Sequence, residues 1–271
     1  MRRASKLSTG LLLAACLMAA AARPASAETR SVCAKPVYLT FDTGHMDIAE
    51  LVADILIRQQ VKVTFFAADE RTRVGDGSLG DYWAPWWRAR GAEGHEFASH
   101  TLDHVYWRGD VSGGGPGFVV RPTAGPNEGQ EMTWSSQRYC EQISQAAVRL
   151  QALTGKPSLP LYRAPGGKTS PALLAAAQSC GYRHVGWSPA GFLGDELPSE
   201  QYSNARLLKT ALRDIRPGHI LLAHLGIWSR KDPWAPTVLE PLIMGLKERG
   251  FCFQTLSQHP TFKAWVAEHR R

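Results

Sequence analysis

The segment that decides the fold is Tyr38-Leu39-Thr40-Phe41-Asp42-Thr43-Gly44-His45. Its apolar and β-branched residues predict a strand, and Gly44 permits a sharp turn directly after it. Asp42 then stands at the end of that strand, which is where α/β proteins collect their catalytic groups. The remaining sequence has to decide whether Asp42 is a catalytic acid or only a helix-capping residue.

The first 27 residues predict a cleaved export signal. A basic start is followed by an apolar run from Leu11 to Ala22 and by the small residues Ala25-Ser26-Ala27, which are the three regions of a signal peptide. The apolar run is too short for a membrane span. We therefore expect a periplasmic or secreted protein with no membrane span after cleavage. A lipoprotein signal ending at Cys16 is the alternative, and the apolar residues that continue past Cys16 favour simple cleavage.

Charge gives little information about partners, and the cysteines leave several arrangements open. The net charge is +7, and removal of the four basic residues of the signal leaves +3. This small excess gives no support to a nucleic-acid partner.

The cysteines after the signal are Cys33, Cys140, Cys180 and Cys252. In an exported chain they allow two disulfides in any of three pairings, and buried thiols are the alternative.

Short β-rich segments alternate with segments of helical periodicity over residues 28–271. We predict strands at 37–41, 61–67, 160–163, 184–188, 219–224 and 251–255. We predict helices at 47–59, 83–92, 136–153, 171–180, 203–215 and 237–249, a helical turn at 100–104, and a long loop at 110–129. This alternation predicts one α/β domain with a mostly parallel sheet, open or closed into a barrel.

Polar groups lie at the expected ends of several strands and turns. His100 and His104 have the spacing that lets two imidazoles on one helical turn share a metal ion. His224 ends an apolar strand, and Arg163 stands where a strand gives way to a turn and needs a carboxylate partner. Each residue alone also fits an ordinary surface or core position. Together with Asp42 they supply what metal-assisted hydrolysis requires, namely ligands, a base and an acid.

The order of these motifs resembles the polysaccharide deacetylase family, which is carbohydrate esterase family 4 with its NodB-like homology domain. The resemblance covers residues 35–256 and rests on Thr40-Phe41-Asp42, His100-Thr101-x-x-His104, Arg163-x-Pro165-x-Gly167 and Ile220-Leu221-Leu222-x-His224. It implies a distorted (β/α) barrel that holds one divalent metal ion, often zinc. It also implies removal of N-acetyl or O-acetyl groups from a polysaccharide or oligosaccharide.

The resemblance also implies roles for individual residues. Asp42 looks like the catalytic base, Arg163 like the group that holds it, and His224 like the general acid. His100 and His104 look like metal ligands. The substrate-binding positions are Gly166, whose backbone N–H serves the oxyanion in the family, and Trp187.

The chain departs from the family pattern at three positions. The second acid of the first motif, a metal ligand in the family, is Thr43 here, so the third ligand is open. Water, His45 or Asp42 could fill it, or the site could bind metal poorly, and we predict His45 or water. The usual aromatic of the arginine motif is Gly166. An acid expected soon after Trp187 is absent, and Asp195 is the nearest residue able to orient His224.

We therefore predict an exported, zinc-dependent hydrolase that removes N-acetyl groups from peptidoglycan or a chitin-like polymer. Two other functions stay open, a non-catalytic glycan-binding protein on the same scaffold and a hydrolase of small non-peptide amides. Aromatic side chains that stack on sugar rings favour a glycan. The candidate stacking platforms are Trp86, Trp87, Trp228 and Trp234.

Overall fold

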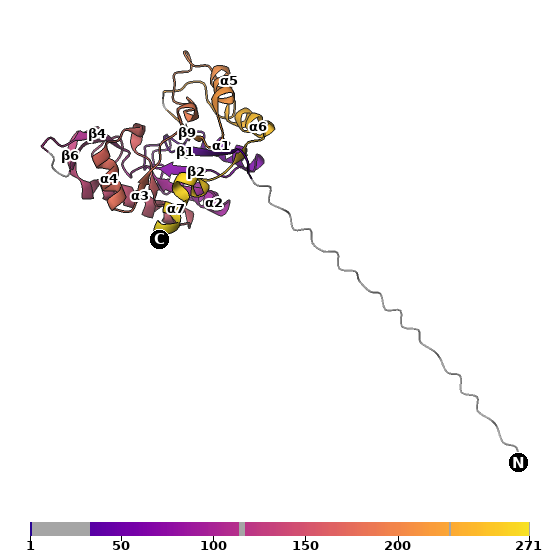
Figure 1. The fold of residues 1–271 in the computed structure, drawn as a ribbon, viewed down its shortest axis with the longest axis horizontal. Helices are drawn as coiled ribbons and strands as arrows, with labels where there is room; N and C mark the ends of the chain where they lie inside the picture. The colour runs from indigo at the N-terminus through magenta and orange to yellow at the C-terminus, as the bar shows by residue number, and fades with distance from the viewer. Residues whose placement is uncertain (2–32, 114–116, 228, 271) are drawn as a thin grey trace. The chain divides into compact units, whose positions relative to one another are not determined.

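The computed structural model describes residues 33–113, 117–227 and 229–270, and Met1 (Figure 1). The predicted signal at 1–27 and the candidate platform Trp228 lie outside the described residues, so both stay predictions. Within the described ranges, no helix combines the length and the apolar character needed to cross a membrane.

A sheet whose strand pairs are all parallel organises the domain. Its order is β10 (Cys252–Phe253), β1 (Pro36–Asp42), β2 (Thr64–Ala67), β3 (Glu96–Ser99), β7 (Leu161–Tyr162) and β8 (Arg183–His184), and β9 (Ile220–His224) also pairs with β1. After β8 the chain runs beside β9, where Ser188 N donates to Ile220 O and Leu193 N donates to Leu222 O. The strands therefore close into the distorted barrel that the family resemblance implies.

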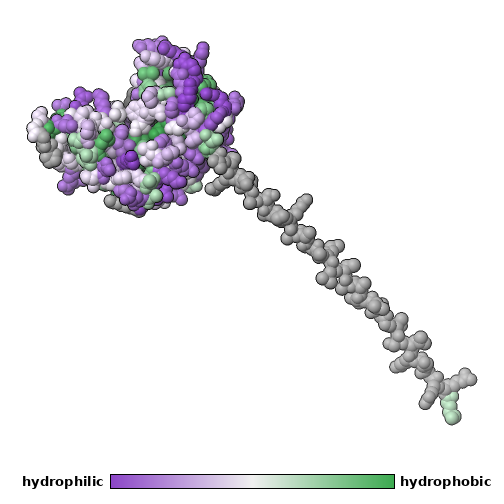
Figure 2. Space-filling model, in the orientation of Figure 1, coloured by the Kyte–Doolittle hydropathy of each residue, from purple (hydrophilic) through white to green (hydrophobic). Residues whose placement is uncertain are grey.

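Seven described helices follow the strands and pack around the sheet (Figure 1). They are α1 (Ala49–Arg58), α2 (Ala84–Ala92), α3 (Ser136–Thr154), α4 (Pro171–Ser179), α5 (Asn204–Asp214), α6 (Leu239–Glu248) and α7 (Pro260–His269). The first six agree with the predicted helices to within two residues at each end, and α7 is not predicted. Ser170 caps α4 by accepting a hydrogen bond from Leu173 N, which is the interaction expected of an N-terminal serine. The outward side of α5 is mostly hydrophilic (Figure 2).

The prediction of a long loop at 110–129 is wrong. This region contains β5 (Gly117–Pro122), which pairs antiparallel with β4 (Val105–Asp110) and with β6 (Met132–Ser135) in a second, three-stranded sheet. Alternate residues of β5, Phe118 and Val120, are buried against Trp134 and Tyr139. Because glycines and prolines surround this short strand, its alternating pattern of apolar residues was not recognised in the sequence.

Three of the tryptophans predicted as sugar platforms are core residues, so that prediction is wrong for them. Trp86, Trp87 and Trp234 are 5%, 0% and 1% exposed and belong to the largest hydrophobic cluster. Both indoles of α2 meet the ring of Phe65 in β2 edge to face, with centroids 5.6 and 5.9 Å apart. Burial of this area stabilises the fold but leaves these faces out of reach of a sugar ring.

Two disulfides select one of the three possible pairings. Cys33 is bonded to Cys252, which ties the chain before β1 to β10, and Cys140 in α3 is bonded to Cys180 at the end of α4. Both bonds lie away from the carboxyl ends of the strands, so they brace the scaffold.

Candidate active site

The candidate residues lie at the carboxyl ends of the parallel strands, which meet at one edge of the sheet. Asp42 ends β1 and is the register partner of His224, the last residue of β9. His100 and Arg163 directly follow β3 and β7, whose last residues are also register partners. The sheet register therefore brings four residues from distant parts of the sequence to one level.

The best-defined contact of the site is the buried pair of Asp42 and Arg163, which are 3% and 0% exposed. Arg163 Nη1 donates to Asp42 Oδ1 over 2.6 Å. Its Nη2 donates to Thr40 Oγ1 over 3.0 Å and its Nε to the Val185 carbonyl over 3.1 Å. Burial by itself raises the pKa of Asp42, but the charges of Arg163, His100 and His224 bring that pKa below its usual value. The carboxylate is therefore ionised and fixed, as a general base must be.

His100 and His104 lie in a non-helical turn, so the predicted helical turn is wrong. Strand β3 ends at Ser99, and both Thr101 and His104 have left-handed backbone conformations with φ of 62° and 47°. The hydroxyl of Thr101 holds the turn by donating to the His100 carbonyl and accepting from Val105 N. The two imidazoles still meet, with ring centroids 4.8 Å apart.

Hydrogen bonds orient both imidazoles. His100 Nδ1 lies 2.9 Å from the Arg163 carbonyl, and because a carbonyl only accepts, Nδ1 carries the proton. Burial lowers the pKa of His100 to about 4, so Nε2 presents a lone pair, 3.4 Å from Asp42 Oδ2. His104 Nδ1 is hydrogen-bonded to Thr123 Oγ1 over 2.6 Å. A histidine whose other nitrogen bonds a backbone carbonyl is the usual form of a metal ligand.

Glu70 is a site residue that the sequence analysis missed. It lies three residues after β2, and its side chain is 20% exposed. Its Oε2 accepts from Thr43 Oγ1 over 2.5 Å and from Gly44 N over 2.6 Å, while its Oε1 lies 3.8 Å from His104 Nδ1. Burial by itself raises the pKa of Glu70. The two histidines and the hydrogen bonds from Thr43 and Gly44 have the larger effect and bring this pKa below its usual value. The available signal was an acid shortly after a predicted strand, at the same edge as Asp42.

His45 lies on another side of the site. Its Nδ1 accepts from Asp47 N over 3.2 Å and lies 3.4 Å from Asp47 Oδ1. The His45 ring packs against Gly226, and a Cβ on Gly226 would stand 2.5 Å from this ring. It borders a separate cavity of about 210 Å³ that also includes Asp195. A ligand role for His45 stays a prediction, whereas the acid that approaches His104 is Glu70.

His224 is held by Asp195, the partner that the sequence analysis named. Asp195 Oδ2 accepts from His224 N over 2.6 Å and lies 3.2 Å from His224 Nδ1. Burial lowers the pKa of His224, but Asp195, through its charge and its hydrogen bond, and then Asp42 and Glu196 raise it to about 9. The imidazole therefore carries a proton at neutral pH, which suits a general acid.

Gly166 and its neighbour Gly167 make room for two aromatic rings. Gly166 has a φ of +64°, and a Cβ on it would stand 2.5 Å from Tyr106 Cε1 in β4. A Cβ on Gly167 would stand 2.6 Å from Trp187 Cη2. Tyr106, which the second sheet contributes, therefore lies directly against position 166, where the resemblance leads us to expect an aromatic side chain.

The donor chemistry beside Asp42 fits a divalent metal ion. Two imidazoles with a nearby carboxylate are typical of catalytic zinc, which keeps an open position for water. In the described part of the chain, no three acidic, histidine or cysteine side chains already stand together as a closed metal site. Ion binding here therefore requires side-chain adjustment around His100 and His104.

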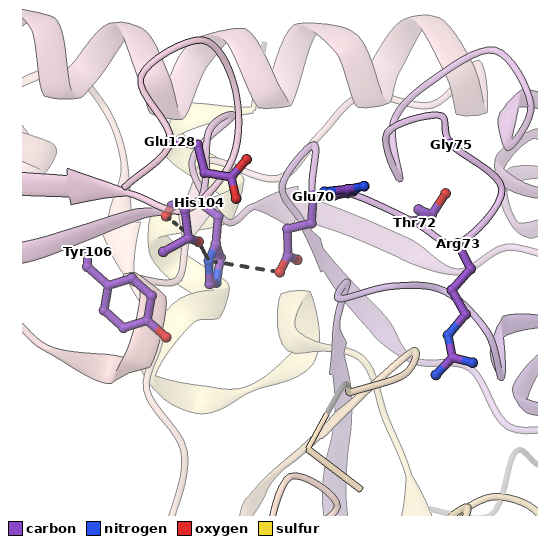
Figure 3. Close-up of a pocket in the computed structure, with 9 residues that line it drawn as sticks. Glu70, Thr72, Arg73, Gly75, His104, Tyr106 and Glu128 are labelled. Atoms are coloured by element: carbon purple, nitrogen blue, oxygen red, sulfur yellow. Dashed lines mark hydrogen bonds and ion pairs between the residues drawn. The ribbon is translucent and has the colours of Figure 1, made fainter. Parts of the chain in front are cut away.

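A cavity of about 740 Å³ opens beside His104 (Figure 3). Glu70 and His104 border its middle, Tyr106 lies toward one end and Arg73 toward the other (Figure 3). This volume is within the range of small-molecule sites. A ligand in the cavity can therefore reach His104, whose ring lies against that of His100.

The chain is similar to known proteins in sequence and in fold. A family model described as polysaccharide deacetylase matches residues 29–185. A chitooligosaccharide deacetylase of Azorhizobium caulinodans is 26% identical over an alignment of 230 residues that covers 81% of this chain and 92% of the relative. The structure of a family 4 acetyl xylan esterase from Clostridium thermocellum, in complex with a cobalt ion, gives a TM-score of 0.64 at 23% identity and covers 88% of this chain and 97% of the esterase. A family 4 pseudoenzyme from Bacillus anthracis gives a TM-score of 0.59 at 17% identity, covering 83% of this chain and 65% of the pseudoenzyme. At these identities the two structures show a shared fold.

Proposed function

Because the chain belongs to the polysaccharide deacetylase family, we propose that it is a metal-dependent hydrolase that removes N-acetyl groups from an amino-sugar glycan. The observation that carries the proposal is the buried Asp42–Arg163 pair at the strand end opposite His224. An ionised carboxylate and a protonated imidazole then serve one reaction centre. The similarity to a chitooligosaccharide deacetylase supports an N-acetylated substrate.

A divalent metal ion held by His100 and His104, for which we propose zinc, would polarise the acetyl carbonyl and lower the pKa of the attacking water. His100 is prepared for this role because its Nδ1 is committed to the Arg163 carbonyl. The Nε2 atom is then left to face the reaction centre.

The protein's own groups move the protons. Asp42 accepts the proton of the attacking water, and Arg163 keeps Asp42 ionised and fixed in position. His224 donates its proton to the departing amine nitrogen, and Asp195 positions the imidazole and keeps it charged. The backbone N–H of Gly166 is available for the developing oxyanion in the turn that follows Arg163.

A glycan substrate and an exported location are supported by further features. Tyr106 and the partly buried Trp187 place two aromatic rings beside Gly166 and Gly167, where a sugar ring could stack. The two disulfides favour an oxidising compartment. Export by the predicted signal at 1–27 agrees with this, and we propose a periplasmic or secreted enzyme.

The test is acetate release from peptidoglycan, N-acetylated chitooligosaccharides, acetylated xylan and small acetamides, with and without zinc or cobalt. We expect metal-dependent release from an N-acetylated glycan. Asp42→Asn should lower kcat by about 10²–10⁴-fold, because the base is lost while the shape is kept. Asp54→Asn is the matched control, since Asp54 is exposed on α1. If Asp42→Asn does not fold, because Arg163 is left unpaired, His224→Gln tests the same site.

Undiminished acetate release from either folded variant would overturn the roles given to these residues. Release from small acetamides alone would favour an amide hydrolase. Retained glycan binding without acetate release at any metal concentration would favour a non-catalytic glycan-binding protein.

A further inference from the structure

We propose that Glu70 is the third protein ligand of the metal site, a carboxylate that reaches the site from the turn after β2 in place of one at position 43. This inference rests on the proposed function, because it completes the same site. It also gives Thr43 a definite role as the residue that positions Glu70.

The contacts of Thr43 show a hydroxyl that serves a carboxylate. Its Oγ1 has one proton, which it donates to Glu70 Oε2 over 2.5 Å, and it accepts from Ala68 N over 3.1 Å. Gly44 N donates to the same Glu70 oxygen over 2.6 Å. One oxygen of Glu70 is therefore anchored by two donors from the turn after Asp42, and the side chain cannot swing freely.

The other carboxylate oxygen of Glu70 is turned toward His104. Oε1 lies 3.8 Å from His104 Nδ1, and the ring of His100 is 4.8 Å from that of His104. Figure 3 shows the Glu70 carboxylate and the His104 ring facing each other, and both residues border the cavity. The Glu70 carboxylate and the His104 imidazole thus border one solvent-connected cavity, and the buried His100 ring lies against that of His104.

Charge and donor count favour Glu70 over Asp42 as the ligand. Oδ1 of Asp42 is engaged by the Arg163 guanidinium, and a base needs its other oxygen for the proton. The carboxylate of Glu70 is held by two neutral donors, the Thr43 hydroxyl and Gly44 N, instead of by a guanidinium. Two histidines and one glutamate with an open position form a donor set used by catalytic zinc.

The experiment measures cobalt binding directly, by visible absorption during titration and by metal content after dialysis. The wild-type protein should bind one ion per chain. Glu70→Gln should weaken binding by at least about 100-fold, and Thr43→Val by about 10–100-fold, because Thr43 acts through Glu70. Glu128→Gln, an exposed acid of the same cavity, is the matched control and should bind as the wild type. His45→Ala should also keep wild-type affinity.

A second substitution tests whether cobalt binding that is lost in Glu70→Gln can be restored. Thr43→Asp in the Glu70→Gln background places a carboxylate directly after β1 and should restore cobalt binding. Wild-type affinity in Glu70→Gln, in a protein that binds cobalt and releases acetate, would overturn the assignment of Glu70 and leave the proposed function intact. Loss of binding in His45→Ala with retention in Glu70→Gln would transfer the ligand role to His45. A wild-type chain that binds no divalent ion would overturn both proposals.

Discussion

The contact between His224 and Asp195 makes stability and activity depend on pH in a way that one substitution can test. Asp195→Asn removes the negative charge but keeps a side-chain oxygen that can still accept from His224 N, the 2.6 Å hydrogen bond of the native protein. The change is nearly isosteric at a residue that is 4% exposed. It therefore isolates the electrostatic part of the contact.

The expected magnitude follows from the pKa of His224, which is raised from 6.5 to about 9. Each pKa unit corresponds to about 1.4 kcal/mol, so this shift stabilises the fold by roughly 3 kcal/mol. Below pH 6.5 the imidazole is charged in both the folded and the unfolded state, and the whole stabilisation is present. Between pH 6.5 and 9 only the folded state keeps the proton, so the stabilisation declines. Above pH 9 it is lost.

Denaturant unfolding at pH 6, 8 and 10, with the disulfides intact, measures this difference. Asp195→Asn should be less stable than the wild type by up to about 3 kcal/mol at pH 6, and the difference should shrink to about 1 kcal/mol or less at pH 10. The alkaline limit of kcat, near pH 9 in the wild type, should move down by at least about one unit, because a general acid must stay protonated. A stability difference that is equal at all three pH values would refute the reasoning and leave Asp195 a purely structural residue.

Two further substitutions test the scaffold around the site. Gly166→Ala forces a side chain into a left-handed conformation and places a methyl group 2.5 Å from the Tyr106 ring, so we expect a loss of about 1–3 kcal/mol of stability. A lowered Tm that Tyr106→Ala partly restores would agree, and an unchanged Tm would contradict the close approach. Replacing Cys140 and Cys180 by serine removes a cross-link that spans 40 residues and should lower the free energy of unfolding by about 2–4 kcal/mol. Guanidinium unfolding checks this, and an unchanged midpoint would show that the bond does not stabilise the fold.

Features with a local physical cause could be predicted from the sequence. The apolar period over 47–59 gave α1 because one helix face must be buried. The acid and histidines at strand ends could be gathered at one edge because parallel strands share a direction. The pairing of Arg163 with a carboxylate followed from the cost of an unpaired buried guanidinium.

Features that depend on contacts between distant segments could not be predicted. Glu70 follows a strand like many surface acids do, and only the packed turn shows that Thr43 and Gly44 hold it. Tyr106 lies against Gly166, where an aromatic residue was expected, because a separate sheet folds against that turn. Trp86 and Trp87 are buried by α2 packing on β2, which composition alone does not distinguish from an exposed sugar platform.

The pairing of β1 with β9 has a consequence for when the enzyme becomes active. Asp42 and His224 are 182 residues apart in the chain (224 − 42), yet they are direct register partners. A chain that emerges from its N-terminus presents Asp42, the proposed base, early, while His224, the proposed acid, arrives only when most of the protein has followed. Any nascent or truncated chain that ends before β9 thus carries Asp42 without His224. In the proposed mechanism, activity therefore begins only when synthesis and folding of the chain are nearly complete.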